Sequence, residues 1–169
     1  MKALGVAGKM STMTVSSAPK SSTVPTAVTT IDTRMLESLV GYNARRASLA
    51  IIEVFAQRMA VYDLPVIDFS ILSLITHNPG ITSRQLGATL KIQPPNLVSK
   101  ISGFEKRGLI ERQPHPQDGR AVGLHLTPAG TTLMAQAERT ATELEDAATH
   151  RLSATERKLL MRLLQKIYL

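Results

Sequence analysis

The stretch that decides the fold is residues 109–130, with the sequence LIERQPHPQDGRAVGLHLTPAG. It begins as an extended run, and two prolines and the pair Asp118-Gly119 then predict a turn. Thr127 before Pro128 is a good N-cap followed by proline at the first helical position. Between turn and cap, apolar side chains alternate with small or polar ones, as in a half-buried strand: Val122, Leu124 and Leu126. The stretch therefore predicts a β-hairpin that leads into a helix.

Short helical segments precede this hairpin. Residues 65–77 predict a helix that ends at an Asn-Pro-Gly turn. Thr82 opens a capping box, which predicts a second helix over residues 82–90. Two consecutive prolines pre-set the first turn of a third helix over residues 94–107. The order helix, turn, helix and hairpin predicts a winged helix-turn-helix lobe over residues 63–127.

Long apolar helices flank the lobe. Residues 33–62 predict one long helix that is apolar on more than one side, which is typical of a helix buried between two partners. The last helix carries an apolar stripe that no later residue covers: Leu159, Leu160, Leu163, Leu164 and Ile167. We therefore expect 33–62 and 128–169 to be dimerisation helices of a homodimer, and residues 1–32 to be a disordered tail. The expected fold class is mainly α with a small β-hairpin wing.

Charge favours an anionic partner. Lys and Arg number 20 against 13 Asp and Glu, a net charge of +7, which favours nucleic acid first. The absence of cysteine excludes disulfides and thiolate metal sites. No apolar run approaches the roughly 18 residues of a membrane span. We expect a cytoplasmic, nucleoid-associated protein that binds double-stranded DNA and has no membrane partner.

Catalytic patterns are missing from the sequence. It contains no nucleophile elbow and no glycine loop that would cradle a phosphate. The histidines are spread over different predicted elements: His77, His115, His125 and His150. We therefore expect no catalytic residues, no metal site and no cofactor, and the protein is not predicted to be an enzyme.

The third helix of the lobe is the predicted recognition helix. Its apolar stripe faces inward, which leaves outward side chains that suit base edges: Gln93, Pro95, Asn96, Ser99 and Lys100. Asn and Gln can pair with adenine, and Lys can contact guanine or phosphate. Ser83 and Arg84 begin the preceding helix, where backbone N–H groups and a cation suit a phosphate. The alternative is a solvated helix face.

The hairpin supplies the other predicted contacts. Arg120 lies near its tip, and an arginine on a narrow ribbon can enter the minor groove. Asp118 could hold that guanidinium by a charge-assisted hydrogen bond. The Asp-Gly pair could also be present only for turn geometry, and the two interpretations are compatible. Two further residues are secondary phosphate candidates, Arg112 and His115.

In this order and at these spacings, the pieces resemble the MarR family of winged-helix transcriptional regulators over residues 36–167. The matching segments are Gly80-Ile81-Thr82 with Gln85-Leu86, Gly108 to Arg112, Asp118-Gly119-Arg120 and Leu126 to Gly130. The resemblance implies a homodimer joined by its first and last helices, with Arg120 as the wing arginine and Asp118 as its acidic partner. Pro94-Pro95 departs from the commoner pattern at the start of the recognition helix.

The resemblance also implies control by a ligand. Many such proteins release DNA when a small molecule, often aromatic and anionic, binds between the dimer helices and the DNA lobe. The candidate lining residues are Tyr42, Arg45, Arg46 and His77, although the two arginines could instead pair between subunits or face solvent. We therefore expect a homodimeric, sequence-specific repressor on a pseudopalindromic operator, released by a ligand such as an aromatic carboxylate. The alternative is a winged-helix architectural or protein-interaction module without a ligand response.

Overall fold

The computed structural model describes residues 31–115 and 118–169 of the chain. The predicted tail falls almost entirely on residues 1–30, outside this part. The helices are α1 (Arg34–Glu37), α2 (Val40–Met59), the 3-10 helix η1 (Ala60–Tyr62), α3 (Val66–His77), α4 (Ser83–Leu90), α5 (Pro94–Lys106), α6 (Pro128–Ala148) and α7 (Ala154–Tyr168). The strands are β1 (Ile81–Thr82), β2 (Ile110–His115) and β3 (Asp118–Leu126). The predicted fold class, mainly helical with a small β wing, is confirmed.

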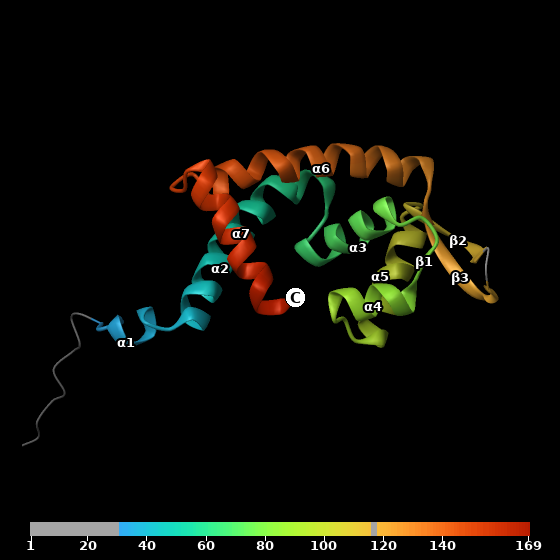
Figure 1. Ribbon diagram of the computed structural model, residues 1–169. Coiled ribbons are helices and arrows are strands. Elements are labelled where there is room, and N and C mark those ends of the chain that lie inside the picture. Colours follow the sequence, from blue (N-terminus) through green and yellow to red (C-terminus); the bar gives the residue numbers. More distant parts are fainter. Residues whose placement is uncertain (1–30, 116–117) are drawn as a thin grey trace, which may run out of the picture.

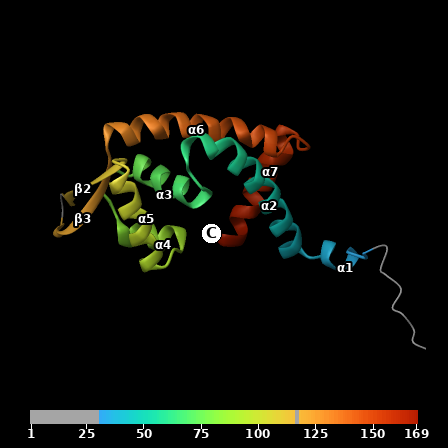
Figure 2. The ribbon, with the colours of Figure 1, turned by 180° about the vertical axis from the view of Figure 1, so that it is seen from behind.

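One long helix connects the two ends of the molecule. Figures 1 and 2 show α6 running along one side, with α2 and α7 crossing near its C-terminal end. The sheet lies at its N-terminal end, and α3, α4 and α5 fill the space beside it. The hairpin and the last helix, which are the two features that the sequence singled out, are therefore at opposite ends of α6.

The single helix predicted over residues 33–62 is wrong. It is interrupted after α1, where the Ser38 hydroxyl donates to the Met35 carbonyl at 2.7 Å. The Asn43 amide donates to the carbonyls of Glu37 at 2.7 Å and Leu39 at 2.8 Å. Side chains that satisfy backbone carbonyls in this way compete with the helical hydrogen bonds, and the chain therefore turns between α1 and α2.

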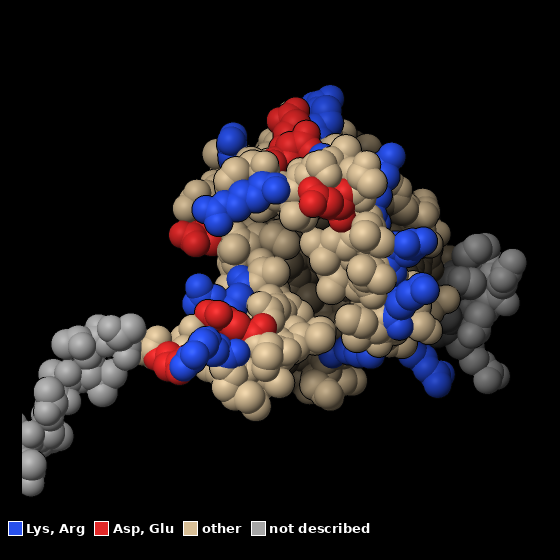
Figure 3. All heavy atoms as spheres, turned by 60° about the vertical axis from the view of Figure 1, so that its left-hand side comes forward, with Lys and Arg blue, Asp and Glu red and all other residues tan. Residues whose placement is uncertain are grey.

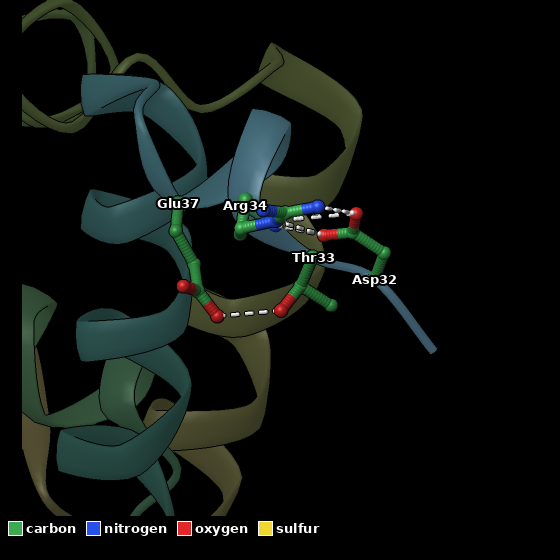
Figure 4. Close-up of polar contacts among 4 residues, drawn as sticks. All are labelled: Asp32, Thr33, Arg34 and Glu37. Carbon is green, nitrogen blue, oxygen red and sulfur yellow. Dashed lines mark hydrogen bonds and ion pairs between the residues drawn. The ribbon is translucent and has the colours of Figure 1, made fainter. Parts of the chain in front are cut away.

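The start of α1 is ordered in part by Asp32, a residue that the sequence placed in the tail. The Asp32 carboxylate accepts the backbone N–H of Arg34 at 3.0 Å and pairs with the guanidinium of Arg34 at 2.8 Å (Figure 4). These hydrogen bonds from Arg34 lower the pKa of Asp32. The Thr33 hydroxyl donates to Glu37 at 2.5 Å. An acid just before a helix satisfies its free N–H groups, so α1 begins here.

The sheet has one more strand than predicted. Its order is β1-β3-β2, all antiparallel, with Ile81 paired to Leu124 and Ile110 paired to Leu126. A side chain at Gly123 would come within 2.9 Å of Gly80, so only glycine lets these backbones approach. The strand β1 therefore attaches the loop before α4 to the wing.

The predicted turn at Asp118-Gly119 is also wrong, because both residues belong to β3. Pro114 pairs with Val122, whereas His115 pairs with Asp118. The register of the ladder therefore shifts between Pro114 and His115. Proline lacks the N–H that a regular ladder needs, which explains an irregularity at this point. Pro116, also predicted in the turn, and Gln117 lie outside the described residues.

A single apolar core joins the predicted DNA lobe to the flanking helices. Its centre is α3, where Ile71, Leu72 and Ile75 are at most 1% exposed. Residues of both predicted dimerisation segments enter the same core: Phe55 and Met59 from α2, and Met134, Ala137 and Leu144 from α6. The boundaries at 63 and 127 therefore do not separate independently packed cores.

The base of the wing is held against the first turn of α6. The hydroxyl of Thr127 accepts the N–H of Gly130 at 3.1 Å, which confirms the predicted N-cap, and donates to the Gly108 carbonyl at 2.6 Å. The N–H of Thr127 donates to the Leu109 carbonyl at 3.0 Å. A Cβ atom at Gly130 would lie only 2.0 Å from that carbonyl oxygen. This backbone contact therefore requires glycine.

Gly130→Ala should lower the free energy of unfolding by about 1–3 kcal/mol or more, because the added methyl group collides with backbone. Denaturant unfolding measures the change. Gly103→Ala in α5 is the control, because a Cβ there meets nothing within 4 Å. The control should stabilise the helix by roughly 0.5–1 kcal/mol. Equal stability of the two variants would contradict the proposed contact.

Candidate nucleic-acid interface

The pair α4 and α5 forms the predicted helix-turn-helix. Thr82 caps α4 with the expected capping box, accepting the N–H of Gln85 at 3.3 Å. The chain leaves α4 through Lys91 in the left-handed region (φ 52°), and the Ile92 N–H donates to the Gly87 carbonyl at 3.1 Å. Two prolines then occupy the first turn of α5, as predicted.

The outer surface of α5 carries most of the predicted base contacts. Its inner side chains are buried at 1–2% exposure: Leu97, Ile101 and Phe104. Four predicted contacts are exposed on or just before the helix: Gln93, Pro95, Asn96 and Ser99. The fifth, Lys100, is in a different situation.

Lys100 forms an ion pair with α3. Its Nζ lies 2.6 Å from Oδ1 of Asp68, a residue that is only 8% exposed. The pair has no well-aligned hydrogen bond, and Asp68 Oδ1 has no other polar partner among the described residues. The Lys100 ammonium is therefore already engaged in fixing the recognition helix to the core helix.

Arg107, at the end of α5, makes a second attachment. Its guanidinium donates to the carbonyls of Asp63 at 3.1 Å and Tyr62 at 3.2 Å. Asp63 adopts a left-handed conformation (φ 51°) as the chain leaves η1. The end of the recognition helix is thus tied to the turn between η1 and α3.

Arg112, predicted as a phosphate contact, makes a third attachment. Its Nε lies 2.5 Å from the Glu105 carboxylate, so β2 is linked to α5. The hydrogen bond from Arg112 is the main reason why the pKa of Glu105 is lowered. Sequence patterns missed the partners Asp68, Arg107 and Glu105, and the only available signal was an acid among the apolar residues of α3.

Lys100→Ala should destabilise the fold, because it leaves the Asp68 carboxylate buried and unpaired. Since Lys100 is 39% exposed, we expect about 1–2 kcal/mol rather than the larger cost of a fully buried pair. Thermal unfolding measures the loss. Adding Asp68→Asn should restore part of it, because the buried charge is then removed. Lys106→Ala, in the exposed last turn of α5, should change stability by less than about 0.5 kcal/mol. An unchanged melting temperature in Lys100→Ala would show that the Lys100–Asp68 ion pair does not stabilise the fold.

The predicted phosphate contacts on α4 lie where expected. Arg84 is exposed and Ser83 half-buried in the first turn. Among the described residues, no acid lies within ion-pair distance of Arg84. The side chains of Asp118 and Arg120 lie outside the described part of the structure. Their backbone belongs to β3, so their roles stay predictions.

A cavity of about 880 Å³ lies between α3, α6 and α7. His77 faces it and contacts Glu138 at 2.9 Å, while the Ser73 hydroxyl donates to the same carboxylate at 2.8 Å. The other three predicted ligand residues do not line it: Tyr42, Arg45 and Arg46. The cations at its edge are instead Arg157, which pairs with Asp146, and Lys158.

No group of three or more His, Asp or Glu side chains in residues 31–115 and 118–169 could hold a metal ion. No single helix there is long and apolar enough to cross a membrane, although the pair Val40–Tyr62 and Val66–His77, bent by 67°, meets the length and composition test.

Comparison with known proteins identifies the family. A profile described as the MarR family matches residues 62–121. A transcriptional repressor, CouR, bound to a 23-mer DNA duplex is 34% identical, with a TM-score of 0.76 over 82% of this chain and 99% of that one. The chain belongs to the MarR family. A second similar structure is CouR bound to p-coumaroyl-CoA, which is 33% identical and covers 82% of this chain and 97% of that one, with a TM-score of 0.71.

A curated relative of this MarR-family chain is also described as a transcriptional regulator. The putative transcriptional regulatory protein for the hcr operon of Thauera aromatica is 29% identical over 131 residues, 76% of this chain and 78% of that protein. The protein is a DNA-binding transcriptional regulator of the repressor type, and the prediction that it is not an enzyme is confirmed by its family and relatives.

Proposed function

We propose that the protein is a homodimeric repressor that binds a pseudopalindromic operator and is released by an aromatic, anionic ligand. The observation that carries the proposal is the exposed surface of α4 and α5 beside the wing, in a chain 34% identical to a repressor bound to duplex DNA. A repressor acts on the chromosome, so we place it in the cytoplasm.

Apolar side chains left open at the far end support the dimer. No residue of α7 is buried, and its large apolar side chains are 36–69% exposed: Leu159, Leu160, Met161, Leu163, Leu164, Ile167 and Tyr168. Three more apolar side chains are 41–45% exposed: Leu36 in α1, Leu39 between α1 and α2, and Ile52 in α2. Figure 3 shows this end of the molecule, where uncharged atoms occupy the centre and charged side chains surround them. A second copy would cover this apolar area.

Leu160 and Leu164 are the best test of the dimer. They line an apolar groove of about 620 Å³ against α2, while remaining 36% and 40% exposed. Replacing both with Asp should abolish the dimer, because burying unpaired charge costs several kcal/mol. Light scattering measures the mass, and circular dichroism checks the fold. Thr155→Asp is the control, since a negative charge suits the first turn of α7. A folded, dimeric double variant would place the interface elsewhere.

Operator recognition is tested by selecting bound sequences from a random pool. A two-fold dimer should select half-sites one helical turn apart, roughly 34–36 Å. Arg84→Gln should weaken binding to all DNA sequences alike. It should also reduce the slope of the logarithm of the binding constant against the logarithm of the salt concentration by about one. Arg139→Gln is the matched control, because α6 lies on the far side of α3 from α4 (Figure 1). Equal affinity for selected and random duplexes would leave the alternative of an architectural module.

The ligand proposal rests on the cavity and on one relative. The walls of the cavity between α3, α6 and α7 are largely apolar, and Phe69, Met161 and Leu164 suit an aromatic ring. Lys158 at the edge of the cavity suits a carboxylate or phosphate, whereas Arg157 is already paired with Asp146. Because CouR is described as bound to p-coumaroyl-CoA, we propose an aromatic acyl thioester of coenzyme A, or the free aromatic carboxylate, as the ligand class.

Such a ligand lowers DNA affinity only by binding the DNA-free state more tightly. Linkage then requires operator DNA to weaken ligand binding by the same factor. Calorimetric titration with p-coumaroyl-CoA and with p-coumarate, each with and without operator, measures both factors. Ala141→Leu, which fills the cavity, should weaken ligand binding, and exposed Ala135→Leu should not. Identical ligand affinity in the presence and absence of operator would contradict release by that ligand.

A further inference from the structure

The recognition helix carries an exposed apolar side chain that none of the predicted contacts includes. Val98 is 56% exposed, although its neighbour Leu97 is 2% exposed. It is the most exposed large apolar residue among the described side chains of residues 63–127, ahead of Val122 at 44%. An apolar side chain left in water on a DNA-reading helix requires an explanation.

The charged side chains of α5 are either paired with other elements or lie late in the helix. Lys100 is held by Asp68, and Glu105 is held by Arg112. Lys106 stands in the last turn. Apart from Lys100, whose ammonium is paired with Asp68, the first two turns present an uncharged surface that includes Asn96, Val98 and Ser99. Guanine is read most often by a free Arg or Lys, and this surface offers neither.

Val98 also borders a small hollow between α4 and α5. The hollow has a volume of about 300 Å³, and its walls are mainly apolar, with Ile92, Leu97 and Val98 among them. Ser83 and Arg84, the phosphate candidates of α4, line the same hollow. The exposed valine thus lies between the predicted phosphate contacts and the predicted base-reading face, next to the proposed DNA-binding surface.

We propose that Val98 contacts the 5-methyl group of thymine, so that the recognition helix selects A·T pairs in each half-site. The thymine methyl is the apolar group that base edges display in the major groove, and apolar side chains recognise it by contact. Asn96 supplies the matching hydrogen bonds to adenine. This inference rests on the proposed sequence-specific binding, and it assigns a base preference to the same surface.

Deoxyuridine tests the contact, because it lacks only the methyl group and keeps the base-pairing hydrogen bonds. Each thymine of the selected operator is replaced in turn, symmetrically in both half-sites, and affinity is measured by fluorescence anisotropy at fixed salt. For the parent protein, one position should lose about three- to fivefold in affinity for each methyl group removed. Val98→Ala should bind the thymine and uracil operators equally.

Matched variants separate the outcomes. Val98→Thr keeps one methyl group and the β-branched shape, so it should keep part of the thymine preference. Asn96→Ala should bind more weakly while keeping the thymine-to-uracil ratio of the parent. An unchanged ratio in Val98→Ala, or a parent that is indifferent to every uracil, would overturn the proposal. Loss of preference for selected over random DNA in the parent would instead overturn the proposed function.

Discussion

The contact between Gly130 and the Leu109 carbonyl is the constraint on which the geometry of the wing depends. At this point two backbones approach so closely that a Cβ atom would lie 2.0 Å from the oxygen. The contact joins the residue just before β2 to the first turn of α6, and Thr127 bridges the same segments through both its N–H and its hydroxyl. The wing is therefore positioned by the helix that carries the other end of the molecule, and not by the recognition helix alone.

The recognition helix is positioned by polar contacts as well as by its buried stripe. Lys100, Glu105 and Arg107 attach α5 to α3, to β2 and to the turn after η1. Each contact uses a charge that a helical-wheel argument would assign to DNA or to solvent. What is left for base recognition on the first two turns is neutral, and this favours hydrogen-bonding and methyl contacts over cationic ones.

Local patterns in the sequence predicted the features that local physics determines. The capping box at Thr82, the cap at Thr127 and the prolines that start α5 concern neighbouring residues, and all appear in the structure. Features that depend on a distant partner were missed. The strand β1 exists because Ile81 finds Leu124, and Lys100 is engaged because Asp68 lies beside it, 32 positions earlier in the chain.

The same distinction applies to the errors. The break after α1 depends on where the Asn43 amide finds carbonyls, which periodicity does not encode. Asp118 and Gly119 were predicted in the turn together with the prolines, but both residues belong to β3, opposite an irregularity in the ladder at Pro114. The ligand residues were chosen by helix rather than by position, so only His77 reached the cavity.

The length of α6 has a mechanical consequence. Its 21 residues, at about 1.5 Å each, make a rod of about 31 Å. The cavity borders its C-terminal half, from Glu138 to Asp146, and the wing is fixed at its N-terminal turn. A tilt of about 5° at the cavity end therefore displaces the wing by about 3 Å, close to the 3.4 Å spacing of bases along one DNA strand. A rigid helix of this length would act as a lever arm, because a small tilt at its cavity end would be enlarged at the wing.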